Sequence, residues 1–352
     1  MSGEPHPPIP FGSLKPKDWP DIDHALMNKA RQGGGLFGPR GVAAKWSAGN
    51  LETVEYRYGV FLWWLQRTER LDPSTSPSMR ASPEIIEAFV ADYGAGHASV
   101  STAGVVHGVR EALRAMEPEA DLTMVARAAA HLRTAAKPRP KIARMADPIE
   151  LLQLAEEMID FGARRLDEGH MLSALKVRDG LMMLALLACP IRRADFQSLR
   201  LGVSLLRDNC GFHVSFHESK TGAPYQADYP ARLTDAFETY VDRARPILLA
   251  RANKPDEGWL WLGAEGERMT GKALSRRLRE LTGFHLERPM SAHLFRDCVA
   301  TEIALREPAH VGIAAPILGH AQAATSEKYY NQAKSFEAFR RHQELIERER
   351  KE

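Results

Sequence analysis

Cysteine, net charge and long apolar runs are all scarce in this chain of 352 residues. Its three cysteines, Cys189, Cys210 and Cys298, are odd in number and far apart, which argues against a disulfide framework and fits a reducing compartment. No apolar run reaches the roughly 20 residues that a membrane-spanning helix needs, and no signal peptide is recognised. We therefore expect a cytoplasmic protein without membrane contact.

Signatures of metal and nucleotide sites are also missing. There is no Cys-x-x-Cys or His-Glu-x-x-His motif, and His213 and His217, on one face of a strand-like run, are a weak metal-site candidate. Residues 266–273 nearly match a phosphate-binding loop, but Ala273 replaces the hydroxyl residue that would hold magnesium. Thr270 as the N-cap of a helix explains these residues better. We expect no metal and no nucleotide cofactor.

The net charge of +2 shows no overall basic excess, so a nucleic-acid partner has to be recognised from local charge. Between Leu122 and Ala146 the chain has no acidic residue, and Pro138 and Pro140 stiffen the segment. It is either a solvated basic linker or one that contacts phosphates. Its basic residues are Arg127, Arg133, Lys137, Arg139, Lys141 and Arg144.

Apolar periodicity divides the chain into segments. Residues 1–46, rich in Pro and Gly, are expected to be largely disordered, with a short helix over 21–30. Four helices follow: one capped by Asn50, one capped by Ser82, then 99–116 and 122–135. Asp147 and Glu150 form a capping-box-like start to a new domain. Strand-like runs at 203–206, 212–216 and 224–229 predict a three-stranded antiparallel meander.

The residues that carry chemistry are concentrated near the carboxyl end. His293 and Arg296 are three apart in a helix-like run, so they share one helical face. Leu318-Gly319-His320 and then Tyr329 follow at short intervals. Upstream, an apolar helix ends in a turn that is followed by Arg192, Asp195 and Leu199-Arg200. Lys220 lies in a Ser-Lys-Thr-Gly turn between two predicted strands.

Together these residues resemble the tyrosine recombinase (phage integrase) family over residues 147 to 340, although Cys189-Pro190 stands where the family usually has Gly. The resemblance implies a mainly α fold with a small antiparallel β-meander. It assigns the segments as an extension (1–46), a helical core-binding, SAM-like DNA-binding domain (47–136), a basic linker (137–146), a catalytic domain (147–333) and a C-terminal helix (334–352). That helix would dock in its own chain or on a neighbouring protomer.

The resemblance also implies an activity, site-specific breakage and rejoining of DNA strands through a 3′-phosphotyrosine, without metal or ATP. Tyr329 would be the nucleophile. Arg192 and Arg296 would hold the non-bridging phosphate oxygens, and His320 would hydrogen-bond the phosphate. His293 would assist proton transfer from the tyrosine and Lys220 would protonate the leaving 5′ oxygen, with Asp195 supporting Arg192.

Two alternatives stay open: a DNA-binding regulator that keeps the fold without cutting, and a type IB topoisomerase-like enzyme that relaxes DNA. All six catalytic positions are filled, which argues against the regulator. The partner implied is double-stranded DNA with paired recombination half-sites, bound by a homo-tetramer that is a monomer or dimer when free. An accessory DNA-bending or directionality protein is a further candidate partner, and the location expected is the nucleoid.

Overall fold

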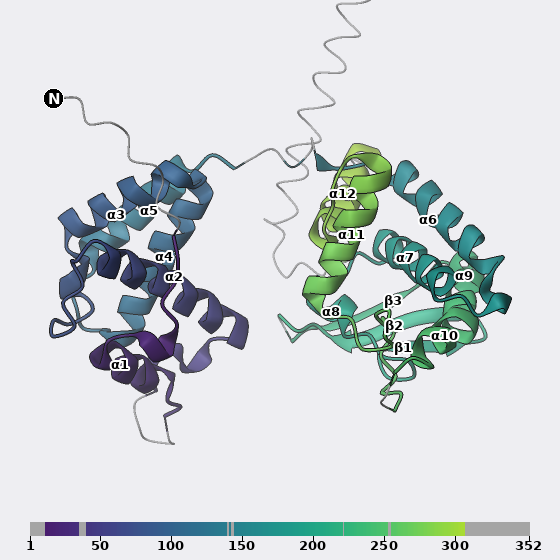
Figure 1. Cartoon of the computed structure of the whole chain (residues 1–352), viewed down its shortest axis with the longest axis horizontal. Coiled ribbons are helices and arrows are strands. Elements are labelled where there is room, and N and C mark those ends of the chain that lie inside the picture. Colours follow the sequence, from purple (N-terminus) through teal and green to yellow (C-terminus); the bar gives the residue numbers. More distant parts are fainter. Residues whose placement is uncertain are drawn as a thin grey trace, which may run out of the picture. The chain divides into compact units, whose positions relative to one another are not determined.

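The computed structural model describes residues 11–34, 40–138, 141, 144–220, 222–252 and 255–306. The chain forms two compact units, residues 1–139 and 140–352 (Figure 1). As the sequence predicted, the described part is mainly helical with one small antiparallel sheet. None of the described helices is long and apolar enough to cross a membrane.

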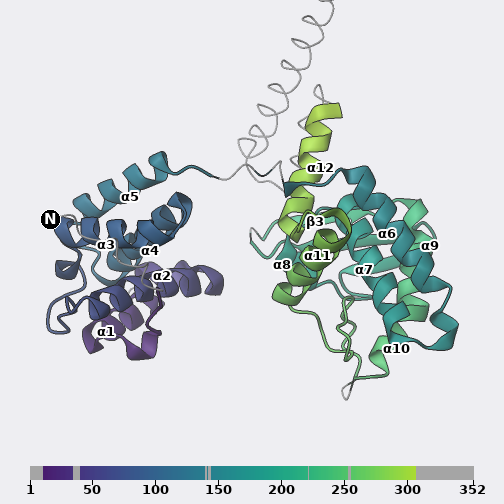
Figure 2. The same ribbon diagram turned by 45° about the horizontal axis from the view of Figure 1, so that its top comes forward.

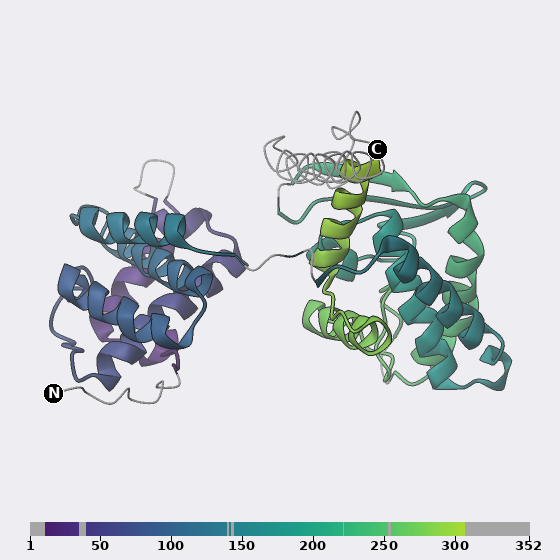
Figure 3. The same cartoon turned by 90° about the horizontal axis from the view of Figure 1, so that it is seen from above.

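The first unit is a cluster of five helices. They are α1 (Asp21–Arg31), α2 (Ala48–Arg67), α3 (Pro83–Gly96), α4 (Ser99–Met116) and α5 (Thr123–Ala135). Helix α4 lies at the centre and packs against the other four (Figures 1 and 3). The four helices predicted from apolar periodicity are therefore all present. Ser82 caps α3 as predicted, whereas Ser47, not Asn50, caps α2 and accepts a hydrogen bond from the Asn50 backbone N–H.

The expectation that residues 1–46 are largely disordered is wrong for the described residues 11–34 and 40–46. Helix α1, predicted over 21–30, is present, and Trp19, Met27 and Ala43 lie in the core of the unit. The Leu14 backbone N–H donates to the carbonyl of Gly59 at 3.0 Å. A Cβ at Gly59 would lie 2.2 Å from the Leu14 carbonyl oxygen, so a glycine there lets the segment lie directly on α2. A few well-placed apolar side chains thus outweigh the Pro- and Gly-rich composition.

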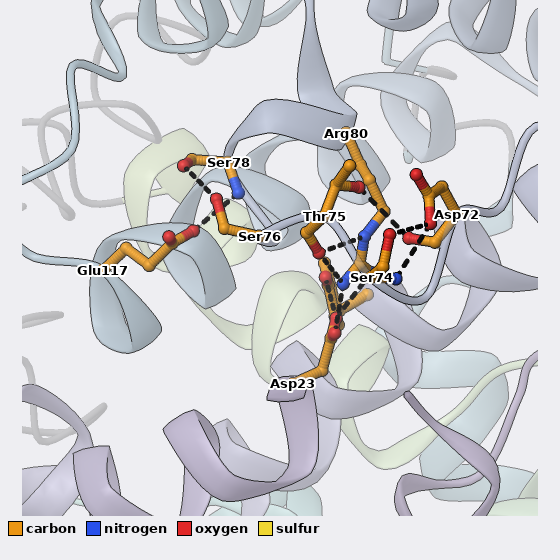
Figure 4. Close-up of polar contacts among 9 residues, drawn as sticks. Asp23, Asp72, Ser74, Thr75, Ser76, Ser78, Arg80 and Glu117 are labelled. Carbon is orange, nitrogen blue, oxygen red and sulfur yellow. Dashed lines mark hydrogen bonds and ion pairs between the residues drawn. The ribbon is translucent and has the colours of Figure 1, made fainter. Parts of the chain in front are cut away.

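A buried ion pair fastens this segment to the rest of the unit. Both carboxylate oxygens of Asp23 accept from the Arg80 guanidinium, at 2.9 and 2.5 Å, and Asp23 also accepts from the Tyr58 hydroxyl. Burial and then the charge of Asp23 raise the pKa of Tyr58 well above its ordinary value, so its phenol stays a donor. Arg80 also donates to the Thr75 carbonyl, and nearby Ser78 N–H donates to Glu117 (Figure 4).

We predict that Asp23→Asn lowers the free energy of unfolding of the first unit by about 3–5 kcal/mol, because it leaves the Arg80 charge buried without a counter-ion. Urea unfolding followed by tryptophan fluorescence would measure this, since Trp19, Trp46, Trp63 and Trp64 lie in this unit. Glu111→Gln makes the same charge change at a more exposed pair with Arg114 and should cost less than ~1 kcal/mol. Equal losses in both variants would contradict the prediction.

The second unit is built around α7 (Met171–Ala188), which is buried without interruption from residue 177 to 186. The surrounding helices are α6 (Pro148–Ala163), α8 (Arg193–Gln197), α9 (Thr234–Glu238), α10 (Arg245–Leu249), α11 (Gly271–Leu286) and α12 (Ala292–Arg306). A π-helical segment, Thr239–Ala244, joins α9 to α10. The capping box predicted at Asp147 and Glu150 opens α6.

Helices α11 and α12, which carry several of the candidate site residues, both pack against α6 and α7 (Figure 2). Asp179 on α7 is fully buried and accepts from Arg178 at 3.0 Å and from Arg277 on α11 at 2.8 Å. Buried charges persist when they are paired. This charge cluster therefore fixes α11 against the central helix.

The sheet has the predicted meander order, β1 (Leu205–Asp208), β2 (Gly211–His217) and β3 (Pro224–Asp228), with both neighbouring pairs antiparallel. The three strands run together along one side of the unit (Figure 3). Val214 on β2 is fully buried and Phe212 packs against Phe237 of α9. The β2–β3 turn carries Lys220, so the sheet positions this side chain from the packed core.

Candidate active site

Arg192 lies at the N-cap of α8, at the end of the turn that follows α7. Its guanidinium forms an ion pair with Glu218 at the end of β2. The sequence had assigned Asp195 as the partner of Arg192, whereas the carboxylate that pairs with Arg192 in the structure is that of Glu218. Asp195 is one turn further along α8 and points to a different group. The carboxylate beside Arg192 thus comes from the sheet.

Asp195 supports the turn that carries Lys220. One of its carboxylate oxygens accepts from the Ser219 backbone N–H at 2.8 Å, and Asp195 is only 4% exposed. Its other carboxylate oxygen has no hydrogen-bond partner within the described part of the chain. Lys220 itself is exposed at the tip of the turn. Asp195 therefore holds Lys220 in place through the backbone next to it.

Arg296 lies on α12 and is 6% exposed. Its guanidinium donates to the carbonyl oxygen of Pro190, two residues before Arg192. The backbone of residue 190 thus supplies an acceptor to the second arginine, which any residue at this position would also provide. Burial raises the pKa of Cys189 to about 12, so this neighbouring thiol remains protonated. The Pro190 turn brings the Arg296 helix to the start of α8.

His293 is one turn before Arg296 on the same helix, as predicted, and it is exposed. Its Nε2 is 3.4 Å from Nζ of Lys141 and 3.8 Å from the carboxylate of Asp297. Lys141 Nζ in turn lies 2.6 Å from that carboxylate. Lys141, predicted as a DNA contact in the linker, is therefore engaged with α12 in this structure.

A cavity of about 640 Å³ opens beside His293. It is lined by the start of α8, the first half of α11 and the residues that lead into α12. Four basic side chains and no acidic one contribute to its wall, so it is a concave, positively charged surface. The lining residues are Arg193, Thr270, Lys272, Ala273, Ser275, Arg276, Arg279, Ser291 and His293.

The loop that nearly matches a phosphate-binding motif has a structural explanation. Thr270 caps α11 as predicted, with its hydroxyl accepting from the Ala273 N–H at 3.2 Å. A Cβ on Gly271 would lie 2.4 Å from the side-chain oxygen of Gln197, so this glycine allows α11 to begin directly against α8. The glycines therefore bring the basic residues of α11 next to Arg193.

The other predicted DNA contacts lie on exposed surface where they are described. Arg127 and Arg133 are exposed on α5, which buries Val125 and Ala129. Lys137 and Arg144 are also exposed, while Arg139 lies outside the described residues. Arg127, Arg133, Lys137 and Arg144 make no ion pair with any described side chain. Nothing in the structure shows what these cations contact.

Two of the six catalytic candidates, His320 and Tyr329, lie outside the described residues. The four described ones occupy neighbouring elements. Glu218 and Asp195 link α8, which follows Arg192, to the turn that carries Lys220. Arg296 shares α12 with His293 and contacts the Pro190 carbonyl in the turn before Arg192. Sequence reasoning missed Glu218 and Asp297. Glu218 is two residues before Lys220, but no local spacing marks it as the partner of an arginine 26 residues away.

Comparisons with known proteins identify the family and the fold. The model of the phage integrase family matches residues 154–335, just over half of the chain. The XerH site-specific recombinase bound to difH substrate, in a pre-cleavage complex, is 14% identical, with a TM-score of 0.51, and the match covers 82% of this chain and 78% of that one. Its post-cleavage complex with palindromic difH substrate is 13% identical, with a TM-score of 0.51 and coverage of 80% and 75%.

No curated protein matches the chain. The two XerH structures, at such low identity, establish a common fold, and the family model covers the part of the chain that contains the site. The chain therefore belongs to the phage integrase family, the tyrosine-type site-specific recombinases.

Proposed function

We propose that this chain breaks and rejoins DNA strands at specific sites through a covalent 3′-phosphotyrosine intermediate. The observation that carries the proposal is the placement of Arg192, Arg296 and Lys220 around one pair of turns, beside the basic cavity at His293. Three cations on packed elements suit a phosphodiester whose charge grows during substitution at phosphorus. XerH, which shares the fold, was solved with its difH substrate.

The reaction that we propose exchanges one phosphoester bond for another. The Tyr329 oxygen attacks the scissile phosphorus, a bond to phosphorus forms, and the bond to the 5′ oxygen of the leaving strand breaks. A free tyrosine has a pKa of about 10, so its proton must be accepted as the attack proceeds. His293 would accept it, while Lys220 would donate a proton to the leaving 5′ oxygen.

The arginines would stabilise the transition state. A guanidinium presents its N–H donors in a planar fork that matches two phosphate oxygens, so Arg192 and Arg296 would hold the non-bridging oxygens, with His320 as a further donor. The intermediate retains the energy of the phosphodiester, and a 5′ hydroxyl can reverse the step. The positive charge is supplied by side chains, so we propose that no metal or nucleotide takes part.

DNA binding would use the basic surfaces. The cavity with Arg193, Lys272 and Arg279 would take backbone phosphates near the scissile one, and α5 with the linker would contact phosphates further away. Each phosphate neutralised steepens the log–log salt dependence of binding by about 0.9. We propose that the active form on DNA is a homo-tetramer on paired half-sites, within the nucleoid.

An apolar groove of about 310 Å³ on the second unit is a candidate docking surface for the C-terminal helix. Leu152 of α6, Leu184 and Leu187 of α7, and Val299 of α12 are among its lining residues. The predicted C-terminal helix, residues 334–352, has a narrow apolar face that such a groove would accept. The C-terminal helix could occupy the groove of its own chain or that of a neighbouring protomer.

The test is a nicked suicide DNA substrate, in which the cleaved fragment diffuses away and traps the intermediate. Target sequences would first be found by sequencing DNA trapped covalently on the protein in cells. We expect adducts to form in EDTA without nucleotide, and mass spectra to show the DNA attached to Tyr329. The amount of adduct should decrease as salt rises, because salt weakens DNA binding. DNA binding without any adduct would indicate the non-cutting regulator. Relaxation of supercoiled DNA without strand exchange would indicate the topoisomerase-like enzyme.

A further inference from the structure

Glu218 is a buried carboxylate at the junction of the two elements that carry Arg192 and Lys220. It is 6% exposed and directly follows β2, at the point where the chain turns toward β3. Its carboxylate faces the Arg192 guanidinium, whose side chain is 20% exposed. Burying a carboxylate is costly unless it is paired. The ion pair is therefore part of the packed structure of the site, and the proposed reaction gives no role to its Glu218 member.

The backbone of Glu218 also closes the turn that carries Lys220. Its N–H donates to the Ala223 carbonyl at 2.9 Å, and its own carbonyl accepts from the Gly222 N–H at 2.8 Å. Gly222 adopts a φ of +69°, which glycine tolerates without strain. Because Asp195 of α8 holds the Ser219 N–H of the same turn, α8 and the turn are joined twice. Of these two links, the ion pair of the Glu218 side chain is the one that involves a candidate catalytic residue, Arg192.

Glu218 and Arg296 also both influence a third group, the phenol of Tyr225. Tyr225, opposite Phe216 in the sheet, has its pKa raised by burial first and then by Cys189, while Arg296 lowers it and Glu218 raises it. Arg296 and Glu218 thus both act on one buried phenol. A change in the charge of Glu218 would be felt across the site where both arginines would meet the phosphate.

We propose that Glu218 is a positioning residue that fixes the plane of the Arg192 guanidinium for the scissile phosphate. It also places a negative charge beside the site, which opposes the attraction of that arginine for DNA. The inference rests on the proposed function. The inference goes beyond the proposed function because it assigns two opposite effects to the Glu218 side chain: weaker DNA binding and faster cleavage.

Glu218→Gln keeps the shape of the side chain and removes its charge. We expect DNA affinity to rise about 3- to 10-fold, since one repulsion with the phosphates is lost. We expect the single-turnover cleavage rate on the suicide substrate to fall about 10-fold, because the charge-assisted hydrogen bond from Arg192 becomes a weaker neutral one to the glutamine oxygen. A merely structural role would lower binding and cleavage together.

Two further variants make the result decisive. Glu238→Gln, on α9, removes a carboxylate that pairs with Arg207 of β1 at the exposed surface, and should leave both the affinity and the cleavage rate within about twofold of the unmodified chain. Glu218→Asp retains the charge on a shorter side chain. It should restore the original affinity and recover part of the cleavage rate.

The outcomes separate the two proposals. An unmodified chain that forms no adduct would overturn the proposed function. Adducts in the unmodified chain, with Glu218→Gln cleaving at the same rate, would overturn only the role of Glu218. A Glu218→Gln variant that loses binding, cleavage and thermal stability in parallel, without recovery in Glu218→Asp, would show a structural role and would also overturn the inference.

Discussion

Tyr329→Phe should abolish covalent protein–DNA adducts while DNA affinity stays within about twofold of the original. Phenylalanine keeps the ring but has no oxygen to attack phosphorus, so no covalent step can replace the one that is lost. The phosphate-binding cations are unchanged, and they dominate affinity. Denaturing gels of the suicide substrate would measure the adducts, and gel-shift titrations would measure the binding.

Tyr330→Phe is the matched control, because it makes the same change one position away. Neighbouring residues on a helix point about 100° apart, so only one of the two tyrosines can face the scissile phosphate. The spacing from His320 selects Tyr329, and the Tyr330 variant should still form adducts. Adducts that persist in Tyr329→Phe would assign the nucleophile to a different residue.

Arg296→Lys should reduce the single-turnover cleavage rate by about 10²–10³-fold, the size of effect seen when one donor to a developing oxyanion is removed. Arg296 is buried and already donates to the Pro190 carbonyl. A guanidinium has several donors and can hold that carbonyl and a phosphate oxygen together, whereas a lysine ammonium, a compact point charge, cannot match this planar geometry. Thermal unfolding would establish that the variant is folded.

Arg193→Lys is the comparison, because Arg193 is an exposed residue on the wall of the basic cavity. The proposed role of Arg193 is to attract phosphates through its positive charge, and lysine keeps that charge. The cleavage rate of Arg193→Lys should therefore fall no more than a few-fold. Arg192→Lys should resemble Arg296→Lys. An inactive Arg193→Lys beside an active Arg192→Lys would show that the assignment of this helix is wrong by one residue.

Local signals in the sequence were sufficient for most of the secondary structure. Apolar residues at helical spacing gave α2 to α5, the serine at position 82 and the Asp147–Glu150 capping box marked helix starts, and turn residues bounded the three strands. These signals act within a few residues, so they can be read from the chain alone. The same holds for His293 and Arg296, whose spacing places them on one face of α12.

Contacts between residues far apart in the chain could not be predicted from the sequence. The amino-terminal segment looked unstructured because its apolar residues are few, yet Trp19 and Met27 complete a core that other helices supply, and Asp23 meets its partner 57 residues away. Asp195 lay at the expected distance from Arg192 along the chain, but its carboxylate supports the Lys220 turn. Spacing along a helix could not show that another element would provide the nearer carboxylate.

The sequence by itself identified the residues that we propose carry the chemistry, because the order and spacing of Arg192, Lys220, His293 and Arg296 resemble one family and are local properties of helix, turn and strand. Only the tertiary structure decided how they are held: Glu218 against Arg192, Pro190 against Arg296, and Lys141 against Asp297. Each of these contacts joins elements that are separate in the chain. The packing of α11, α12 and the sheet around α7 sets them, and no periodicity in the chain encodes that packing.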